Sequence, residues 1–300
     1  MISVILPSYN SENTIQKCLN GLLNQSYKGN YEIILVDSSV DRTPQIVSKN
    51  FPSINFIHLE QKTDPGTARN MGIEKAKGDL IAFIDSDCIA SADWLKKIVS
   101  AHKSTSYNVI GGVVNNGNQK DDIVGLAGYI SEFRDFLPGS QRQTVKHIPT
   151  CNISYKKKIF QKFGNFQGKY YPQEDLVFNH KLFLCGEKIL RDPQIQVYHH
   201  HRSVFKDYVI HQNRIGAITS KVLKMIDMEG SLIANNPGIA IVLFPFLPVV
   251  KFVRTIATFL KYQPDALLKR PLVVFLFISG LISWNLGFVR GVFEKDSINI

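Results

Sequence analysis

Short β-rich apolar runs alternate with amphipathic segments along the first hundred residues. The runs predict strands at Ile2 to Leu6, Glu32 to Val36, Asn55 to Leu59 and Leu80 to Ile84. Between the strands, apolar residues recur at helical spacing and predict helices over 14–23, 44–50, 66–77 and 93–102. Chains that alternate strands and helices in this way form a mostly parallel, twisted sheet with helices on both faces. We therefore predict an α/β fold.

The regular alternation ends near residue 105. Beyond it, the pattern predicts a strand at Val109 to Val114, a helix at Glu174 to Leu184 and a strand at Ile195 to Tyr198. From about residue 226 the composition shifts to apolar stretches separated by a basic connector. We expect one α/β domain over 1–225, with halves 1–105 and 106–225, and a membrane-associated helical tail over 226–300.

Two apolar segments of this tail bear on membrane association. Leu272 to Phe293 is about 20 residues long, which is enough to span a bilayer, whereas Gly238 to Val250 is shorter and contains two prolines. Basic residues lie between them: Lys251, Arg254, Lys261, Lys269 and Arg270. Two spans would place these residues on the far side of the membrane from a cytoplasmic catalytic domain, against the positive-inside tendency.

We therefore expect both apolar segments to lie in the cytoplasmic leaflet or to form a re-entrant hairpin, with the basic residues at anionic headgroups. A single span by Leu272 to Val289 and burial in a homo-oligomer interface are the alternatives. The start of the chain has no basic leader and no long apolar core of a signal peptide. These features favour a catalytic domain at the cytoplasmic face of the membrane.

Charge and cysteine content narrow the class of protein. A net charge of +10 indicates an anionic partner, which charge alone does not identify. The hydrophobic content of 44% allows a full core and excludes extensive disorder. The four cysteines form no C-x-x-C pair, so neither a zinc knuckle nor a disulfide framework is indicated.

Polar residues follow three of the predicted strands directly. The segments are Ser8-Tyr9-Asn10, Asp37-Ser38-Ser39 and Asp85-Ser86-Asp87. Ligands of such sheets bind beyond the carboxyl ends of the strands, so these side chains are expected at one edge. The carboxylates of Asp85 and Asp87 suit Mg²⁺ or Mn²⁺ beside substrate phosphates, although aspartates also cap ordinary turns.

Five segments in a fixed order carry a resemblance to a known family. They are Pro7-Ser8-Tyr9-Asn10, Val36-Asp37-Ser38-Ser39, Thr67-Ala68-Arg69-Asn70-Met71-Gly72, Gly78-Asp79-Leu80 and Asp85-Ser86-Asp87. Together they resemble the nucleotide-binding half of family-2 glycosyltransferases, which have the GT-A fold. The resemblance covers about the first 220 residues. It departs after Asp37, where the family often has a second aspartate or a glycine and this chain has Ser38.

The resemblance implies a nucleotide-sugar donor and a role for each matching residue. Pro7 and Tyr9 would form a wall of the base pocket, and Asp37 would accept from a ring N–H of a uracil-like base. Arg69 would donate beside the base or diphosphate, with Asn10 and Asn70 in the same donor-binding segments. Asp85 would lie near the ribose and the metal, and Asp87 would ligate the Mn²⁺ or Mg²⁺.

The acceptor side is implied by Tyr171-Pro172-Gln173-Glu174-Asp175, which resembles the family's Glu-Asp motif at the start of a helix. Inverting transfer needs one carboxylate to take the acceptor's proton, and Asp175 is the candidate, with Glu174 as the fallback. Acidic residues in a first helical turn also simply complement the helix dipole.

Two further segments are candidates on the same resemblance. The family frequently has a histidine near the metal or diphosphate after a late strand, and His199 and His201 lie on one face of the predicted strand end. Spacing does not decide which histidine reaches the metal. Asn152 resembles a segment that approaches the donor sugar, although an asparagine in a turn would look the same.

We therefore expect a metal-dependent, inverting glycosyltransferase that uses a UDP-sugar or a related donor and acts on a lipid-linked or glycan acceptor, with no nucleic-acid partner. Two alternatives remain. A nucleotidyltransferase would want a Gly-rich basic loop after the first strand, which Pro7-Ser8-Tyr9-Asn10 does not provide. A non-catalytic, membrane-bound module would not need the intact aspartates.

Overall fold

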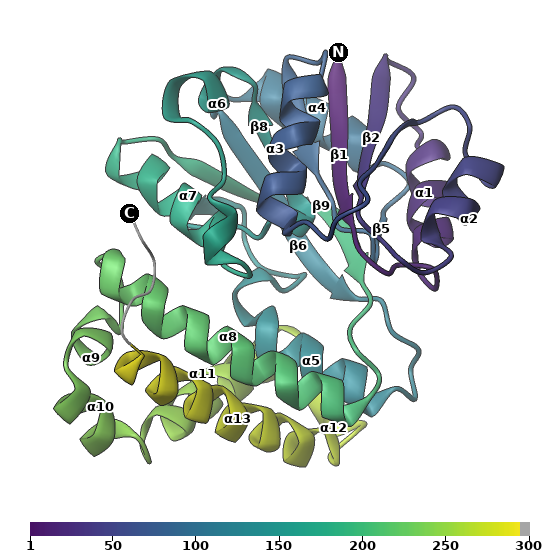
Figure 1. Ribbon diagram of the computed structural model, residues 1–300. Helices are drawn as coiled ribbons and strands as arrows, with labels where there is room; N and C mark the ends of the chain where they lie inside the picture. The colour runs from purple at the N-terminus through teal and green to yellow at the C-terminus, as the bar shows by residue number, and fades with distance from the viewer. Residues whose placement is uncertain (295–300) are drawn as a thin grey trace. The chain divides into compact units, whose positions relative to one another are not determined.

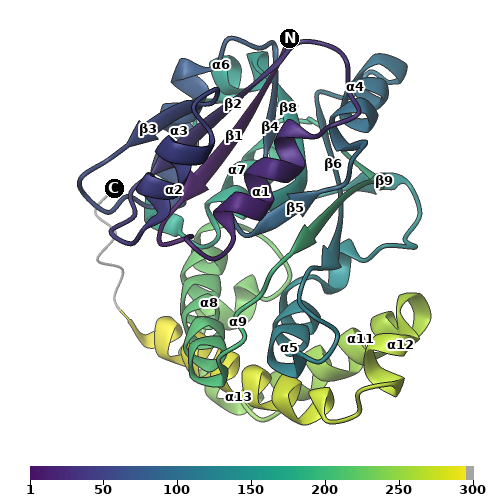
Figure 2. The same ribbon diagram turned by 90° about the vertical axis from the view of Figure 1, so that its right-hand side faces the viewer.

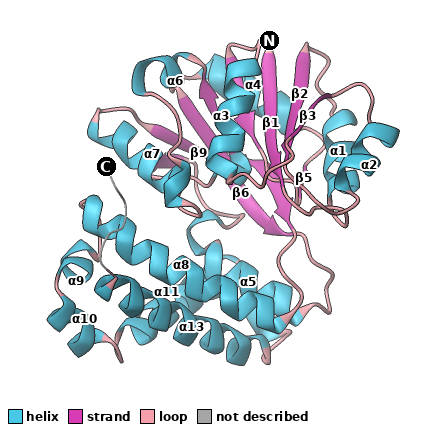
Figure 3. Ribbon diagram, viewed as in Figure 1, coloured by secondary structure: helices cyan, strands magenta, loops and turns pink. Residues whose placement is uncertain are grey.

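A computed structural model describes residues 1–294, which form two compact units. Unit 1 contains residues 1–117 and 138–200, and unit 2 contains residues 118–137 and the described chain from 201 onward. In the described residues all strands belong to unit 1, and unit 2 is helical (Figures 1 and 3).

Unit 1 is built on a nine-stranded sheet of order β3-β2-β1-β4-β8-β6-β9-β5, with β7 paired to β9. The strands are β1 (Ile2–Ser8), β2 (Tyr31–Asp37), β3 (Asn55–His58), β4 (Leu80–Phe83), β5 (Cys88–Ala90), β6 (Val109–Asn116), β7 (Gln143–Val145), β8 (Ile153–Lys156) and β9 (Ile189–His199). Strands β1 to β4 pair in parallel, as the alternation predicts. The second half is mixed, because β8 runs antiparallel to both β4 and β6.

Helices cover both faces of this sheet. They are α1 (Ile15–Leu23), α2 (Thr43–Asn50), α3 (Pro65–Lys75), α4 (Trp94–Ser104), α6 (Lys158–Phe163) and α7 (Glu174–Leu184). Helix α3 packs on β1 and β2, and α4 packs on β6 and β9 from the other side (Figure 2). Gly72 lets α3 approach β1 closely, since a Cβ there would come within 2.4 Å of Ile5.

An aromatic cluster fixes the position of α7. The Phe178 ring of α7 stacks on Phe160 of α6 at 5.4 Å, and Phe166 lies 5.0 Å from Phe178. Phe83 at the end of β4 meets both Phe160 and Phe166 edge-on. Aromatic pairs in these geometries add to the free energy gained by burial. The cluster therefore holds the start of α7 in a defined place relative to the end of β4.

Unit 2 consists of α5 (Ile123–Glu132), α8 (Phe205–Met225), α9 (Ser231–Asn235), α10 (Pro237–Leu243), α11 (Leu247–Tyr262), α12 (Pro264–Leu268) and α13 (Val273–Phe293). Helices α8 and α13 lie backbone against backbone. A Cβ on Gly216 would come within 1.9 Å of the Trp284 carbonyl, and one on Gly287 within 2.0 Å of the Asn213 carbonyl. Glycines at these crossings allow the close approach.

The compact units divide the chain differently from the expected boundary at residue 226. Helix α8 packs along α13, and α5 also packs against α13, so both belong to unit 2. The shift in composition at 226 marks where the sequence becomes more apolar. The unit itself begins at residue 201 and includes the inserted segment 118–137.

The apolar helix predicted near the end of the chain is confirmed as α13. Among the described residues it is the one continuous helix whose length and hydropathy would allow a membrane crossing, and 44% of its most apolar stretch is buried. The shorter apolar segment falls on α10 and α11, which are bent by 62° at the break between them. The core helix of a soluble protein can have the same length and hydropathy, so a membrane role for α13 stays a prediction.

Candidate active site

The polar segments after β1, β2 and β4 meet at one edge of the sheet. Ser8 and Asp37 are register partners at the ends of β1 and β2. The Ser11 hydroxyl lies 2.8 Å from the Ser86 hydroxyl, which joins the loop after β1 to the loop after β4. The carboxyl ends of parallel strands thus bring together segments that are far apart in the chain.

The loop after β1 is held in shape by Asn10. This residue has a φ of 52°, in the left-handed region that asparagine tolerates. Its backbone N–H donates to the Ser39 hydroxyl at 2.7 Å, and its side-chain oxygen accepts from the Val40 N–H at 3.0 Å. Asn10 therefore ties the loops after β1 and β2 together, and its role in donor binding stays a prediction.

Tyr9 lies at the surface of this edge. Its side chain is 39% exposed, and the Lys62 ammonium sits 4.2 Å from the ring centroid. An ammonium over an aromatic face is favourable. The neighbouring Pro7 is buried as a register partner of Val36 in β1 and β2. A nucleobase stacked on Tyr9 would lie close to a cation, a suitable neighbour for a phosphorylated ligand.

Asp37 is fully buried and has partners on both oxygens. Its Oδ1 accepts from the Ser39 hydroxyl, and its Oδ2 accepts from the Nδ1 of His58 at 2.8 Å. The His58 side chain is 37% exposed, so it links the buried carboxylate to the surface. Sequence reasoning missed His58. Its position at the end of β3 could have indicated a place beside Asp37, because the two residues are register partners.

Arg69 bridges the loop after β4 and the start of α7. Its Nη2 donates to Asp85 Oδ1 at 2.7 Å and its Nη1 donates to Glu174 Oε1 at 2.6 Å. The side chain is only 4% exposed. Burial alone would lower the pKa of Arg69, but the carboxylates of Asp85 and Glu174 raise it. Both ends of its fork bind carboxylates inside the protein, and the predicted contact with the base or diphosphate stays a prediction.

Glu174 and Asp175 begin α7 and have different surroundings. Glu174 is buried, and this burial raises its pKa to about 7, against the attraction of Arg69 and with further repulsion from Asp175. Asp175 Oδ2 accepts from the Thr150 N–H at 2.9 Å and from the Thr150 hydroxyl at 3.2 Å. Glu174 is thus part of an internal ion pair, while Asp175 is an oriented carboxylate.

One group of described side chains has the arrangement of a metal site. Asp87, Cys88 and His199 each offer a ligand atom, and these atoms lie within 4.8 Å of one another. Cys88 and His199 are register partners in β5 and β9, so they project on the same face. A carboxylate and an imidazole suit Mn²⁺. The sequence did not indicate Cys88 as a ligand, because it belongs to no C-x-x-C pair.

Two other predicted metal ligands, Asp85 and His201, are not part of this group. Asp85 is engaged by Arg69, and burial raises its pKa further than Arg69 lowers it. His201 belongs to unit 2, where its ring packs 5.3 Å from Phe133 and 5.9 Å from Tyr129. Neither residue joins the group formed by Asp87, so their contact with a metal stays a prediction.

The other two predicted asparagines, Asn70 and Asn152, form hydrogen bonds within unit 1. Asn152 is fully buried: its oxygen accepts from Trp94 Nε1 at 2.8 Å, and its nitrogen donates to the carbonyls of Val113 and Ile195. Asn70 exchanges two hydrogen bonds with the backbone of Phe166, at 2.8 and 3.0 Å. Both amides are engaged by the protein itself, and their predicted contact with the donor stays a prediction.

Comparison with known proteins identifies the family. The family model described as Glycosyl transferase family 2 matches residues 3–164, more than half of the chain. The chain belongs to this family. It is therefore a glycosyltransferase with a GT-A fold, and the two alternative classes considered from the sequence fall away. The family match ends before Asp175, so that residue rests on geometry and on its sequence motif.

Curated relatives of this family-2 member differ in how much of them is matched. Glycosyltransferase AglE of Haloferax volcanii is 37% identical over 38% of this chain, and the match spans only 39% of that relative. A dolichyl N-acetyl-α-D-glucosaminyl phosphate 3-β-D-2,3-diacetamido-2,3-dideoxy-β-D-glucuronosyltransferase of Methanococcus voltae is 24% identical over 99% of this chain and 98% of its own length.

Solved structures share the fold. Mannosyltransferase PcManGT of Pyrobaculum calidifontis, in complex with GDP-Man and Mn²⁺, has a TM-score of 0.63 at 16% identity, covering 98% of this chain and 88% of its own. TarS 1–349 of S. aureus, in complex with UDP-GlcNAc, has a TM-score of 0.54 at 20% identity, covering 96% and 90%. At these identities the likeness establishes the fold alone.

Proposed function

We propose that this glycosyltransferase moves a sugar, with inversion, from a nucleotide-sugar donor to a hydroxyl of a lipid-linked or polysaccharide acceptor at the cytoplasmic face of a membrane. The donor is expected to be a UDP-sugar, and a divalent cation assists the transfer. The observation that carries this proposal is the ordered carboxylate of Asp175. Asp175 lies in the first turn of α7 and accepts from the Thr150 N–H. The preceding residue, Glu174, is linked through Arg69 to Asp85 at the donor edge.

The donor side supports a nucleoside diphosphate and a cation. Asp87 and His199 would hold Mn²⁺ or Mg²⁺, with Cys88 at the third corner of the group. When bound, the cation neutralises the charge that develops on the departing diphosphate. Tyr9 offers an aromatic face for a base, and Asp37 with His58 lies at the end of the neighbouring strands.

The chemistry at the acceptor needs one base. The acceptor hydroxyl loses its proton to the Asp175 carboxylate while its oxygen bonds to the anomeric carbon, and the nucleoside diphosphate leaves with the bonding electrons. One displacement inverts the configuration at that carbon. Thr150 holds Oδ2 through two hydrogen bonds, and the Leu176 N–H donates to Oδ1 at 2.7 Å. These bonds stabilise and orient the charged carboxylate, and the remaining lone pair of Oδ1 would take the proton.

Membrane association has support on unit 2. Apolar side chains on α11 and the turn before it are more than half exposed, among them Phe246, Val249 and Val253. An exposed apolar face of this kind fits the interfacial region of a bilayer. The basic connector contributes less than expected, because Arg254 pairs with Glu229 and Lys251 lies 3.8 Å over the Trp284 ring.

A thermal-shift screen of nucleotide sugars with and without Mn²⁺ tests the donor side of the proposal. A donor at about 100 times its Kd stabilises the native state by about 2.7 kcal/mol, which is a readily measured rise in melting temperature. We expect one nucleotide class to produce this rise and the Asp87→Asn variant to lose its Mn²⁺-dependent part. The proposal fails if no nucleotide sugar shifts the melting temperature under either condition.

A further inference from the structure

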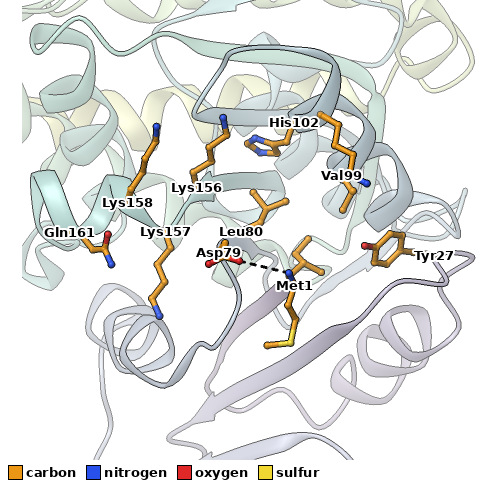
Figure 4. Close-up of a pocket in the computed structure, with 12 residues that line it drawn as sticks. Met1, Tyr27, Asp79, Leu80, Val99, His102, Lys156, Lys157, Lys158 and Gln161 are labelled. Atoms are coloured by element: carbon orange, nitrogen blue, oxygen red, sulfur yellow. Dashed lines mark ion pairs between the residues drawn. The ribbon is translucent and has the colours of Figure 1, made fainter.

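A cavity of about 600 Å³ opens in unit 1 at the amino ends of β1 and β4, where Met1, Ile2, Asp79 and Leu80 line it. The donor edge lies at the other end of the same strands, about 20 Å away for a seven-residue strand. His102 and the consecutive Lys156, Lys157 and Lys158 also line the cavity (Figure 4), as does Lys103. Nothing in the transfer chemistry uses these residues.

This cavity continues on two sides into smaller ones. It shares Tyr27, Val99 and Lys103 with a cavity of about 470 Å³ that is also lined by Lys96. It shares Lys158 and Gln161 with a cavity of about 370 Å³ that is also lined by Lys162. The three adjoining cavities, which share these lining residues, are together called the lysine groove. Its basic residues are Lys96, Lys103, Lys156, Lys157, Lys158 and Lys162.

The positive charge of the lysine groove is mostly uncompensated. The two acidic residues lining it are Asp79 and Glu187, and Glu187 lies 4.0 Å from Lys162. Within residues 1–294, Lys103, Lys156 and Lys158 have no carboxylate within ion-pair distance. Lys156 and Lys158 point the same way, whereas Lys157 points to the opposite side (Figure 4) and donates to the Ala76 carbonyl.

The pKa of His102, a half-buried imidazole in the groove wall, is also affected by the lysine charges. Burial, and next the charge of Lys156, lower its pKa to about 4. His102 is therefore neutral at physiological pH and adds no charge of its own. An anion in the groove would be bound by lysines alone, which are strongly hydrated point charges without the planar fork that selects one carboxylate or phosphate geometry.

We propose that the lysine groove binds an anionic polymer whose charges are spaced along a flexible chain, such as a glycan linked by phosphodiesters. The spread of six lysines over three adjoining cavities favours a chain over a single small anion. A flat bilayer would not enter a concave site. Nucleic acid is disfavoured because single strands are held by stacking on aromatic rings, and Tyr27 is the one aromatic ring of the Phe, Tyr and Trp type among the lining residues.

That the bound polymer is the acceptor of the reaction rests on the proposed function. Bound in the groove, the polymer keeps the enzyme attached while hydroxyls further along the same chain reach the donor edge. This arrangement predicts that the groove affects the KM for a polymeric acceptor and leaves reaction with the donor alone unchanged.

The test measures binding of long-chain inorganic polyphosphate to the full chain by fluorescence anisotropy at two salt concentrations. The groove variant carries Lys103→Ala, Lys156→Ala and Lys158→Ala. The matched control carries Lys49→Ala, Lys75→Ala and Lys188→Ala, three exposed lysines of unit 1 outside the groove, so the two variants have the same net charge. Pyrophosphate, a single-stranded oligonucleotide and anionic vesicles are the comparison ligands.

We expect polyphosphate to bind much more tightly than pyrophosphate. Four neutralised phosphates at about 0.7 counterions each would weaken binding about 50-fold for a fourfold rise in salt. The groove variant should lose at least tenfold in affinity and the control variant less than twofold. Equal losses in both variants, or no loss in the groove variant, would overturn the proposal.

The comparison ligands settle the kind of partner. Tighter binding of the oligonucleotide than of polyphosphate, with loss in the groove variant, would overturn the assignment in favour of nucleic acid. Loss of vesicle binding without polyphosphate binding would overturn it in favour of a membrane contact. Slow hydrolysis of the donor by the groove variant at the wild-type rate shows that the donor site is intact, so a failure of the groove is distinguishable from a failure of the proposed function.

Discussion

Glu174 is predicted to make the stability of this glycosyltransferase fall as the pH rises through neutrality. The buried cluster holds one guanidinium, Arg69, against the carboxylates of Asp85, Glu174 and Asp175. Asp85 and Glu174 bind the guanidinium directly. Its single positive charge cannot neutralise three ionised carboxylates, so ionising all three is unfavourable. Burial in this cluster raises the pKa of Glu174 from 4.5 to about 7.

The direction of the effect follows from proton binding. Between pH 4.5 and 7 the native state holds the Glu174 proton and the unfolded state has released it, so the free energy of unfolding decreases as the pH rises through this window. A shift from 4.5 to about 7 corresponds to about 3 kcal/mol, of which about 2 to 3 kcal/mol falls between about pH 5 and pH 8. Above the folded pKa the loss is complete.

Urea unfolding of the Glu174→Gln variant measures this contribution. Glutamine keeps an oxygen for Arg69 and does not titrate, so the difference in unfolding free energy between wild type and variant should change by about 2 to 3 kcal/mol between about pH 5 and pH 8. The m-value should stay the same. Glu60→Gln, at an exposed position of unit 1, is the control and should show no such change. A difference for Glu174→Gln that is constant across this range refutes the reasoning.

Three further predictions address the neighbouring residues. Arg69→Met leaves the buried Glu174 carboxylate and the partly buried Asp85 carboxylate unpaired and should lower the free energy of unfolding by about 3–5 kcal/mol in urea, whereas a loss below about 1 kcal/mol would contradict the bridge. Thr150→Val removes one donor to Asp175, so kcat for donor hydrolysis should fall about tenfold with an unchanged Kd for the donor, and an unchanged kcat would count against an orienting role. Cys88→Ser should weaken Cd²⁺ binding far more than Mn²⁺ binding in calorimetry, because thiolates prefer soft metals, and an equal effect on both ions would exclude the thiol as a ligand.

The local pattern of the sequence predicts the parallel half of the sheet. Apolar runs of strand length give β1 to β4, and Asp64 with Pro65 marks the start of α3, where the Asp64 carboxylate accepts from the Thr67 N–H. These features are encoded by neighbouring residues. Their positions along the chain therefore follow from spacing and from the chemistry of helix and strand ends.

The contacts that organise the site are not encoded locally. Arg69 and Glu174 lie 105 residues apart, and Thr150 meets Asp175 across 25 residues. Arg69, Glu174 and Asp175 each stand in a recognisable motif. Their pairing, however, depends on how the aromatic cluster around Phe178 holds α7 in place. For the same reason the motif around Arg69 does not reveal that its guanidinium pairs with the internal carboxylates of Asp85 and Glu174.

The second unit shows a different limit. Its inserted helix α5 comes from residues 118–137, a stretch that reads as irregular after the strand at Val109 to Val114. Nothing in its spacing indicates that it packs on α13, which is about 150 residues further along the chain. Composition placed the boundary at 226, but the compact unit is defined by long-range helix packing.

The central claim, that Asp175 is the base of the transfer, is tested most directly by comparing Asp175→Asn with Glu174→Gln. Slow hydrolysis of the nucleotide sugar, with water in place of the acceptor, and the Kd for the same donor are measured for each. The account predicts that Asp175→Asn lowers kcat by about 10²–10⁴ with an unchanged Kd, while Glu174→Gln changes kcat less than tenfold. A large loss in Glu174→Gln together with an active Asp175→Asn would contradict the claim and assign the base to Glu174.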